Sequence, residues 1–308
     1  MFTARMMVPA DFDEVAELIF LSTNSWYQKH FGHSVFQCLP EDCRLFCEVY
    51  EDLDPGCGLV VEHPQTRMVV GSCFYHIRET HVSLGIMNVH PNYFGHGIAG
   101  LILRQIIELS EARGLPLRLI SSAMNLDSYS LYNRSGFSPV SIYQDMVVTV
   151  PTKGLPDRDG PALPEVREAE LVDLVAMGQI EFEVSGISRE RDYCYFIENS
   201  TEVWHTVVSV DDEGQVDGFL VSIDHPASRM IGPGVAKSAA AAEAMLRIQL
   251  DRFRGKTVVF LVPAGEADFV QAAYALGAKN CELHFGQIRG DAQPVSGIVM
   301  PSFLPESG

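Results

Sequence analysis

The stretch at residues 89–100, VHPNYFGHGIAG, constrains this chain more than any other segment. Pro91 has no N–H to give to a sheet, so the apolar strand expected at 81–89 must end before it. The three glycines of the stretch carry no Cβ, which lets the backbone turn tightly and approach a ligand closely. An amphipathic helix is expected at 98–113, and the unpaired amides of its first turn favour anions. The stretch therefore predicts a loop that holds a phosphate-bearing cofactor.

Length and composition predict two soluble domains. The chain has 308 residues, of which 47% are hydrophobic and 20% are charged, and one hydrophobic core seldom serves so long a chain. A segment rich in proline and glycine, PTKGLPDRDGPALP, is typical of a linker. We expect a first domain at 1–150, the linker at 151–164, a second domain at 165–290 and an extended C-terminal tail at 291–308.

Composition also excludes several classes of function. A stretch of about 18 apolar residues is absent from the sequence, so no membrane span is expected, and the acidic N-terminal segment favours a cytoplasmic location. The net charge of −18 argues against nucleic-acid binding. The seven cysteines form no C-x-x-C pair, which indicates reduced thiols, and the histidines show no ligand spacing, so no metal is expected.

Periodicity in the first half indicates a short strand, two helices, an antiparallel meander, the glycine loop, and then a helix, a strand, a helix and a strand. The expected ranges are 3–9, 10–27, 40–50, 58–62, 68–77, 81–89, 98–113, 117–121, 125–135 and 140–150. Three strands joined by tight turns do not begin a parallel βαβ unit.

Two segments resemble nucleotide-binding motifs, and neither satisfies its motif in full. Gly95-x-Gly97-x-x-Gly100 satisfies the dinucleotide fingerprint by letter, but Pro91 to Phe94 separate it from the strand and no carboxylate ends the next strand. The segment GPGVAKS at 232–238 lacks the glycines that a P-loop requires. The phosphate ligand is therefore of another kind.

Two motifs together resemble the GCN5-related N-acetyltransferase (GNAT) superfamily. They are Val89-x-Pro91-x-x-x-Gly95-x-Gly97-Ile98-Ala99 and, about 35 residues later, LYNRSGF at 131–137. The loop motif of the family, Arg/Gln-x-x-Gly-x-Gly/Ala, falls on 94–99, with Phe94 in place of the usual Arg or Gln. The resemblance implies an α/β (α+β) fold of two GNAT-like domains, each a mixed, mostly antiparallel twisted sheet flanked by helices.

The resemblance also implies acetyl-CoA as the co-substrate. Its pyrophosphate would be bound by backbone amides of the loop, which comprises Phe94, Gly95, His96, Gly97, Ile98, Ala99 and Gly100. The strand before the loop would diverge from the strand after the helix, and pantetheine would fill the gap beside the main chain of Val89. Asn125 matches a position that hydrogen-bonds the pantetheine arm.

Catalytic residues follow from the same resemblance. Tyr132 matches the tyrosine that protonates the departing thiolate, and a packed helical tyrosine is the alternative. For the general base, alternation along the strand leaves His81 or Ser83 facing the acceptor, unless a bulge breaks the alternation. A surface position in a hairpin is the alternative for His81.

The second half repeats this order with weaker motifs. Helices are expected at 166–177, 188–198, 239–253 and 269–275, and strands at 204–210, 216–223, 258–262 and 281–288. Alanines replace the phosphate-facing glycines, so no acetyl-CoA is expected there. The second domain would close the acceptor cleft, form a homodimer interface or stabilise the first domain.

The function implied is transfer of an acetyl group from acetyl-CoA to a primary amine of a small molecule or peptide, without a covalent enzyme intermediate. The alternative is a non-catalytic acyl-CoA-binding or sensor protein, which Phe94 and the missing obvious base favour. Trp26, Tyr27 and Phe31 would line the acceptor pocket, or else belong to the core.

Overall fold

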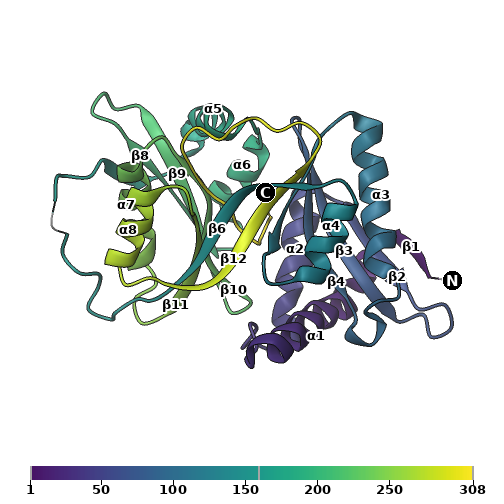
Figure 1. The fold of residues 1–308 in the computed structure, drawn as a ribbon. Coiled ribbons are helices and arrows are strands. Elements are labelled where there is room, and N and C mark those ends of the chain that lie inside the picture. The colour runs from purple at the N-terminus through teal and green to yellow at the C-terminus, as the bar shows by residue number, and fades with distance from the viewer. Residues whose placement is uncertain (1, 159, 307–308) are drawn as a thin grey trace. The chain divides into compact units, whose positions relative to one another are not determined.

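The computed structural model describes residues 2–158 and 160–306. The chain folds into two compact units, whose elements carry the labels of Figure 1. The first unit runs to Leu119 and also includes Phe303–Glu306, and the second unit holds Ile120–Ser302. Within the described part of the chain, no helix combines the length and apolarity needed to cross a membrane.

The first unit is built on a mostly antiparallel sheet. Strands β1 to β4 pair in chain order, each antiparallel to the next, and β5 pairs parallel to β4. The strands are β1 (Thr3–Met6), β2 (Gly58–Glu62), β3 (Val69–Ile77), β4 (Val82–Val89) and β5 (Leu117–Ser122). β5 begins in the first unit and ends in the second.

Helices cover both faces of this sheet. A Cβ on Gly71 of β3 would meet Ile98 and Ile102 of α3, whereas the ring of Phe74 stacks on Tyr50 of α2 at 4.5 Å. Because side chains alternate along a strand, α3 and α2 lie on opposite faces. The helical segments are η1 (Pro9–Asp11), α1 (Phe12–Phe31), η2 (Pro40–Cys43), α2 (Arg44–Leu53), η3 (Pro91–Tyr93) and α3 (Ile98–Arg113).

The second unit has a longer sheet, ordered β12-β6-β11-β10-β9-β8-β7, with β13 paired to β10. Only the pair β10–β11 is parallel in this series. Its strands are β6 (Ser138–Thr149), β7 (Glu165–Glu168), β8 (Trp204–Val210), β9 (Val216–His225), β10 (Ser228–Ala236), β11 (Thr257–Pro263), β12 (Lys279–Arg289) and β13 (Ile298–Met300). Its helical segments are α4 (Leu126–Arg134), η4 (Leu171–Asp173), α5 (Leu174–Ser185), α6 (Glu190–Glu198), α7 (Ala239–Asp251) and α8 (Ala267–Ala275).

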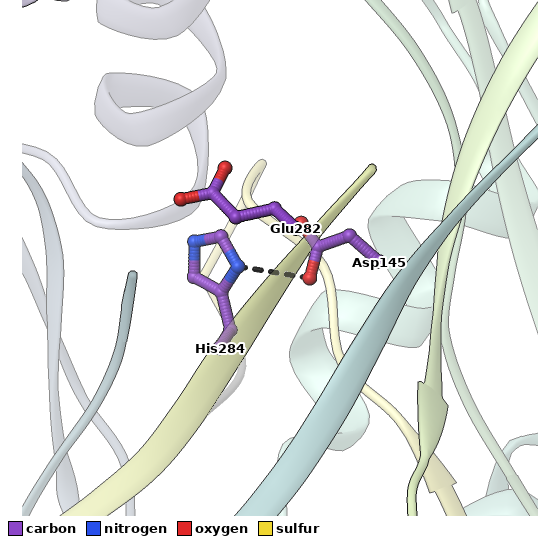
Figure 2. A group of neighbouring side chains, drawn as sticks. All are labelled: Asp145, Glu282 and His284. Carbon is purple, nitrogen blue, oxygen red and sulfur yellow. Dashed lines mark hydrogen bonds and ion pairs between the residues drawn. The ribbon is translucent and has the colours of Figure 1, made fainter. Parts of the chain in front are cut away.

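Strand β6 comes from the first half of the sequence but lies between two strands of the second half. It pairs antiparallel with β11 on one side and with β12 on the other. Side chains reinforce the second pairing, because Asp145 of β6 is hydrogen-bonded to His284 of β12 at 2.8 Å (Figure 2). The sequence order of the elements is therefore not their order in the sheet.

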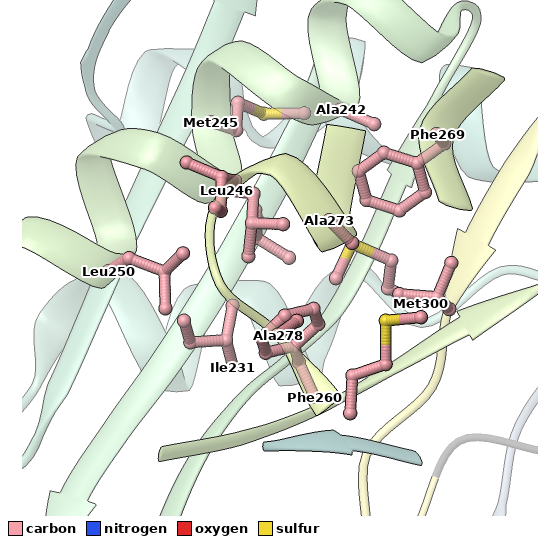
Figure 3. Close-up of a cluster of buried hydrophobic side chains, with 14 of the residues drawn as sticks. Ile231, Ala242, Met245, Leu246, Leu250, Phe260, Phe269, Ala273, Ala278 and Met300 are labelled. Atoms are coloured by element: carbon pink, nitrogen blue, oxygen red, sulfur yellow. The ribbon is translucent and has the colours of Figure 1, made fainter. Parts of the chain in front are cut away.

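A hydrophobic core joins the helices α7 and α8 to this sheet. Leu246 of α7, Phe269 of α8 and Phe260 of β11 are fully buried, and Met300 of β13 packs into the same cluster (Figure 3). Burying one such side chain stabilises the fold by about 1.5–3 kcal/mol. β13 is therefore part of the hydrophobic core of the second unit.

An ion pair repeats at the start of each half. Arg5 binds both carboxylate oxygens of Asp11 at 2.7 and 2.8 Å, and Arg167 binds Asp173 in the same way at 2.7 Å. In each case the same Asp also accepts a backbone N–H three residues earlier. The repeated contact indicates that the two halves share one local structure.

The structure differs from the sequence prediction at three places in the second half. The expected helix at 166–177 begins as β7, and α5 starts only at Leu174. β10 was not predicted, because Gly232-Pro233-Gly234 has the composition of a turn. The segment after 290, expected to be an extended tail, contains β13 and the buried Leu304.

Candidate active site

The glycine loop has the backbone geometry of an anion site. Gly95 and Gly97 both adopt φ of +79°, a left-handed conformation that other residues rarely accept, and Gly97 is the N-cap of α3. No side chain caps this helix end, so the first-turn amides of α3 keep their donors available. A Cβ at either glycine would meet no atom within 4 Å, so both glycines border open space. Open amides at a helix N-terminus can bind an anion.

The seven loop residues expected to bind the cofactor differ in exposure. Phe94 and His96 are exposed, with Phe94 49% exposed, and the His96 ring contacts the Phe94 carbonyl oxygen through Nδ1 at 3.1 Å. Ile98 is buried against Gly71 of β3 and fixes the start of α3 on the sheet. Ala99 and Gly100 complete the first helical turn.

β4 leads into this loop with one edge largely unpaired. It pairs with β5 only at Val82 and Ser83, whereas it pairs with β3 as far as Val89. Beyond Ser83, the described residues of β4 therefore have a strand partner on one side only. The peptide groups near Val89 can serve an extended ligand that runs beside the strand, as the resemblance implies for pantetheine.

A β-bulge interrupts β4 at its middle. Gly85 and Ile86 together oppose the single residue Phe74 of β3. The Ile86 N–H donates to the Tyr50 hydroxyl at 3.3 Å, and a Cβ on Gly85 would lie 2.7 Å from that hydroxyl. Only glycine fits at 85, because Tyr50 of α2 is pressed against the bulge. The bulge breaks the strict alternation from which His81 and Ser83 were predicted to face the acceptor.

The two predicted base candidates are both buried. His81 is only 2% exposed, so the alternative of a surface hairpin position is wrong, and Nδ1 of its ring lies 3.0 Å from the Thr80 hydroxyl. His81 also precedes β4, at the end of the strand opposite to the loop. Ser83 donates its hydroxyl to the Glu306 carbonyl oxygen at 3.3 Å. A catalytic role of His81 stays a prediction.

Sequence reasoning missed a buried ionic network next to the bulge. Asp54 accepts two hydrogen bonds from Arg78 at 2.8 and 2.9 Å and a third contact from His76, whose ring stacks on Tyr50 at 4.7 Å. Burial would raise the pKa of Asp54, but the hydrogen bonds from His76 and Arg78 outweigh it and lower the pKa to about 2. The network holds the end of α2 on β3 as a charged pair.

Tyr132 and Asn125 belong to the second unit. The Tyr132 side chain is 7% exposed and packs edge-on against Phe137, with ring centroids 5.8 Å apart. Asn125 is the N-cap of α4, and its Oδ1 accepts the Ser128 N–H at 3.1 Å. This bond uses the amide oxygen of Asn125, so its Nδ2 group is the part suited to a ligand.

Asp145, Glu282 and His284 form a polar cluster on β6 and β12 (Figure 2). One potential ligand atom from each lies within 4.8 Å of the others, and carboxylate with imidazole is a donor set that transition metals accept. Asp145 and His284 already bind one another, and Ser122 donates to Glu282. The histidine spacing could not reveal this group, since 139 residues separate Asp145 from His284.

The corresponding helix start in the second half is closed. Ser238 is the N-cap of α7, and its Oγ accepts the Ala241 N–H at 3.1 Å. Ala241 and Ala242 are buried. The Ser238 cap and the buried alanines occupy the first turn of α7, whereas the first turn of α3 is open. The two halves therefore differ at the feature that would bind a phosphate.

Comparison with protein families matches both halves of the chain. A model described as "Acetyltransferase (GNAT) family" matches residues 19–137, and one described as "Acetyltransferase (GNAT) domain" matches residues 179–284. No curated protein sequence matches the chain.

Solved structures share the fold over nearly the whole chain. A putative acetyltransferase from Pyrococcus horikoshii is 16% identical, covers 99% of this chain and 95% of its own, and has a TM-score of 0.76. A tandem GNAT protein from the clavulanic acid biosynthesis pathway is 12% identical. The match covers 95% of this chain and 100% of that protein, with a TM-score of 0.62. The Saccharomyces cerevisiae N-myristoyltransferase with bound myristoyl-CoA is 11% identical. The match covers 96% of this chain and 80% of that enzyme, with a TM-score of 0.61. The predicted fold class is confirmed.

Proposed function

Because the chain belongs to the GNAT superfamily of acyltransferases and carries two of its domains in tandem, we propose that it is an N-acetyltransferase with one acetyl-CoA site, in the first half. The acceptor is a primary amine of a small molecule or a peptide. The observation that carries this proposal is the contrast between the two helix starts. At α3 the N-cap is Gly97 and the first-turn amides are open, whereas at α7 Ser238 closes them.

In the first half, backbone groups bind and orient acetyl-CoA. Backbone amides of Gly95 and of residues 97–100 bind the pyrophosphate, where the helix dipole also favours negative charge. The His96 N–H already donates to the Tyr93 carbonyl oxygen at 3.2 Å. The main chain at Val89, on the unpaired edge of β4, orients the pantetheine arm. An N–H there also polarises the thioester carbonyl, so that charge on its oxygen is stabilised during attack by the amine. The bound co-substrate supplies the activated acetyl group.

Tyr132 is proposed as the general acid. Its phenol gives a proton to the departing thiolate, and the phenol then recovers a proton from solvent. Packing against Phe137 restricts the Tyr132 ring, which limits the entropy lost when the hydroxyl is positioned. The Asn125 Nδ2 group is suited to donate to the pantetheine arm.

An aromatic group at the end of α1 supports an organic amine as the acceptor. Trp26, Tyr27 and Phe31 are half-buried and contact one another with centroid distances of 5.0–5.6 Å. They are therefore not fully enclosed core residues. Aromatic faces of this kind attract ammonium groups through cation–π interaction.

The test combines binding and turnover. Acetyl-CoA binding is measured by calorimetry, and release of free thiol is followed with a panel of amines, amino acids, polyamines and peptide N-termini. We expect one acetyl-CoA per chain and thiol release with at least one amine. Binding without thiol release from any amine favours the sensor alternative. Absence of binding contradicts the proposal.

A further inference from the structure

The C-terminal segment Phe303–Glu306 belongs to the first unit, although the strand before it, β13, belongs to the second. Leu304 and Pro305 are buried, and Phe303 and Glu306 form a β-bridge with one another. The end of the described chain is therefore folded into the first unit and is not a loose tail.

Two hydrogen bonds hold the main chain of Glu306 beside the bulge of β4. Its N–H donates to the Tyr50 hydroxyl at 3.3 Å, and its carbonyl oxygen accepts the Ser83 hydroxyl at 3.3 Å. The same Tyr50 hydroxyl accepts the Ile86 N–H of the bulge. Glu306 is thereby fixed to α2 and to the strand whose end leads into the glycine loop.

The side chain of Glu306 has an unusual environment. Its Oε2 is buried and has no hydrogen-bond partner among the described residues, while the residue as a whole is only half-buried. A buried polar atom without a partner costs about 1–3 kcal/mol, and more for a charged group. A buried polar atom without a partner calls for an explanation, and a catalytic role is one such explanation.

Among the described residues, none contributes a positive charge that lowers the pKa of Glu306. Tyr50 of α2 and Cys73 of β3 are the titratable groups that face it, and burial raises the pKa of both, which keeps them neutral. From β4, the Ser83 hydroxyl donates to the Glu306 carbonyl oxygen, and it carries no charge. Burial also raises the pKa of Glu306 well above its usual value. A carboxylate in such surroundings binds a proton strongly.

We propose that Glu306 is the general base that takes the proton from the acceptor amine. This inference rests on the proposed acetyl transfer. In the step, an N–H bond of the acceptor ammonium breaks and an O–H bond forms on Oε2. The neutral amine uses the freed electron pair to form a C–N bond to the thioester carbonyl carbon, and the C–S bond then breaks to release the thiolate, which Tyr132 protonates. The second proton on the attacking nitrogen is lost to water, and Glu306 later passes its own proton to water. Glu306 as a residue is only half-buried, so part of it is open to solvent.

A purely structural role is the competing explanation, in which a protonated Glu306 only fills space. Glu306→Gln separates the two, because glutamine has nearly the same shape as a protonated glutamate but cannot accept a proton. Asp291→Asn is the matched control, since Asp291 is an exposed carboxylate shortly after β12. Each full-length variant is assayed for acetyl-CoA affinity, for Tm, and for kcat against pH with the best amine of the wild-type panel.

If Glu306 is the base, Glu306→Gln lowers kcat by about 100-fold or more. It also removes the limb in which kcat rises with pH, and it leaves acetyl-CoA affinity close to wild type without lowering Tm. Asp291→Asn changes none of these. A kcat within about threefold of wild type, or a retained limb, overturns the inference while the proposed function stands. No turnover by wild-type protein contradicts the proposed function itself.

Glu306→Asp decides the case in which glutamine destabilises the fold. It keeps the carboxylate one methylene further back, so a base retains part of its activity and its pH limb. If Glu306→Asp is folded but as inactive as Glu306→Gln, packing and not proton transfer is what the residue provides, and the inference is overturned.

Discussion

Gly97 and Gly114 stand at the two ends of α3 and form a matched pair for testing the phosphate site. Both adopt a left-handed conformation, with φ of +79° and +65°, and a Cβ on either would meet no atom within 4 Å. An alanine therefore introduces the same backbone strain at each position and no steric clash. We expect each Gly→Ala variant to lose about 1–2 kcal/mol of unfolding free energy, measured by urea denaturation.

Glutamate at the same two positions separates stability from binding. At Gly97 the carboxylate lies at the positive end of the α3 dipole and at Gly114 at its negative end, so Gly114→Glu should be the less stable variant. Affinity should follow the opposite order. A carboxylate about 5 Å from a phosphate charge, at an effective dielectric constant of about 20, is repelled by about 3 kcal/mol. Gly97→Glu should therefore raise the Kd for acetyl-CoA by about 100-fold or more, and Gly114→Glu should leave it unchanged.

The assay is calorimetric titration of acetyl-CoA into wild type and the four variants, at a temperature where all are folded. An unchanged Kd in Gly97→Glu would refute the assignment of the loop. Equal weakening in both glutamate variants would mean that loss of stability, and not the position of the charge, explains the effect.

Three further predictions concern single side chains. Tyr132→Phe should lower turnover severely with acetyl-CoA affinity nearly intact, whereas Tyr129→Phe on the same helix should not; equal turnover in both would exclude the general acid. Asp54→Asn should cost about 3–5 kcal/mol in urea unfolding because Arg78 loses its buried partner, against less than about 1 kcal/mol for the exposed Asp52→Asn. In wild type, the pKa of Asp54 near 2 contributes about 2 kcal/mol that is present above about pH 4 and is lost as the pH falls through 2. The raised pKa of Glu306 acts in the opposite direction, since its contribution is complete below about pH 4 and is lost as the pH rises. Glu306→Gln should therefore match wild type in unfolding free energy near pH 4 and exceed it at pH 8, and parallel curves would contradict this.

Local chemistry made much of the first unit predictable. The range of α3, 98–113, and that of β2, 58–62, agree with the sequence prediction, because glycines with positive φ flank α3 and the turns around β2 are rich in proline and glycine. The loop residues were named for the same reason. The conformational freedom of a glycine and the dipole of a helix depend on a few adjacent residues, so both can be inferred from a short stretch of sequence.

Features that depend on distant residues could not be predicted in this way. β10 contains Gly232-Pro233-Gly234, which is a turn signal by composition, yet a Cβ on Gly234 would lie 2.5 Å from the Leu220 side chain of β9. Glycine is required there by close approach of a neighbouring strand, which no local pattern shows. Glu306 was missed likewise, since Tyr50, its hydrogen-bond partner, lies 256 residues earlier in the chain. The sequence did contain one signal of the repeated local structure, because an Arg and an Asp six residues apart occur near the start of each half.

The position of β6 between β11 and β12 also bears on the order in which the protein is synthesised. Thr149 at the end of β6 faces Thr257 of β11, which is made 108 residues later. Until then both edges of β6 lack their native neighbours, and an unpaired edge is a template for pairing with other chains. A fragment that stops at residue 150 keeps this exposed strand permanently. Although each half matches its own family model, a cut between them separates β6 from β11 and β12, and a nascent chain can complete this sheet only when the second half has emerged.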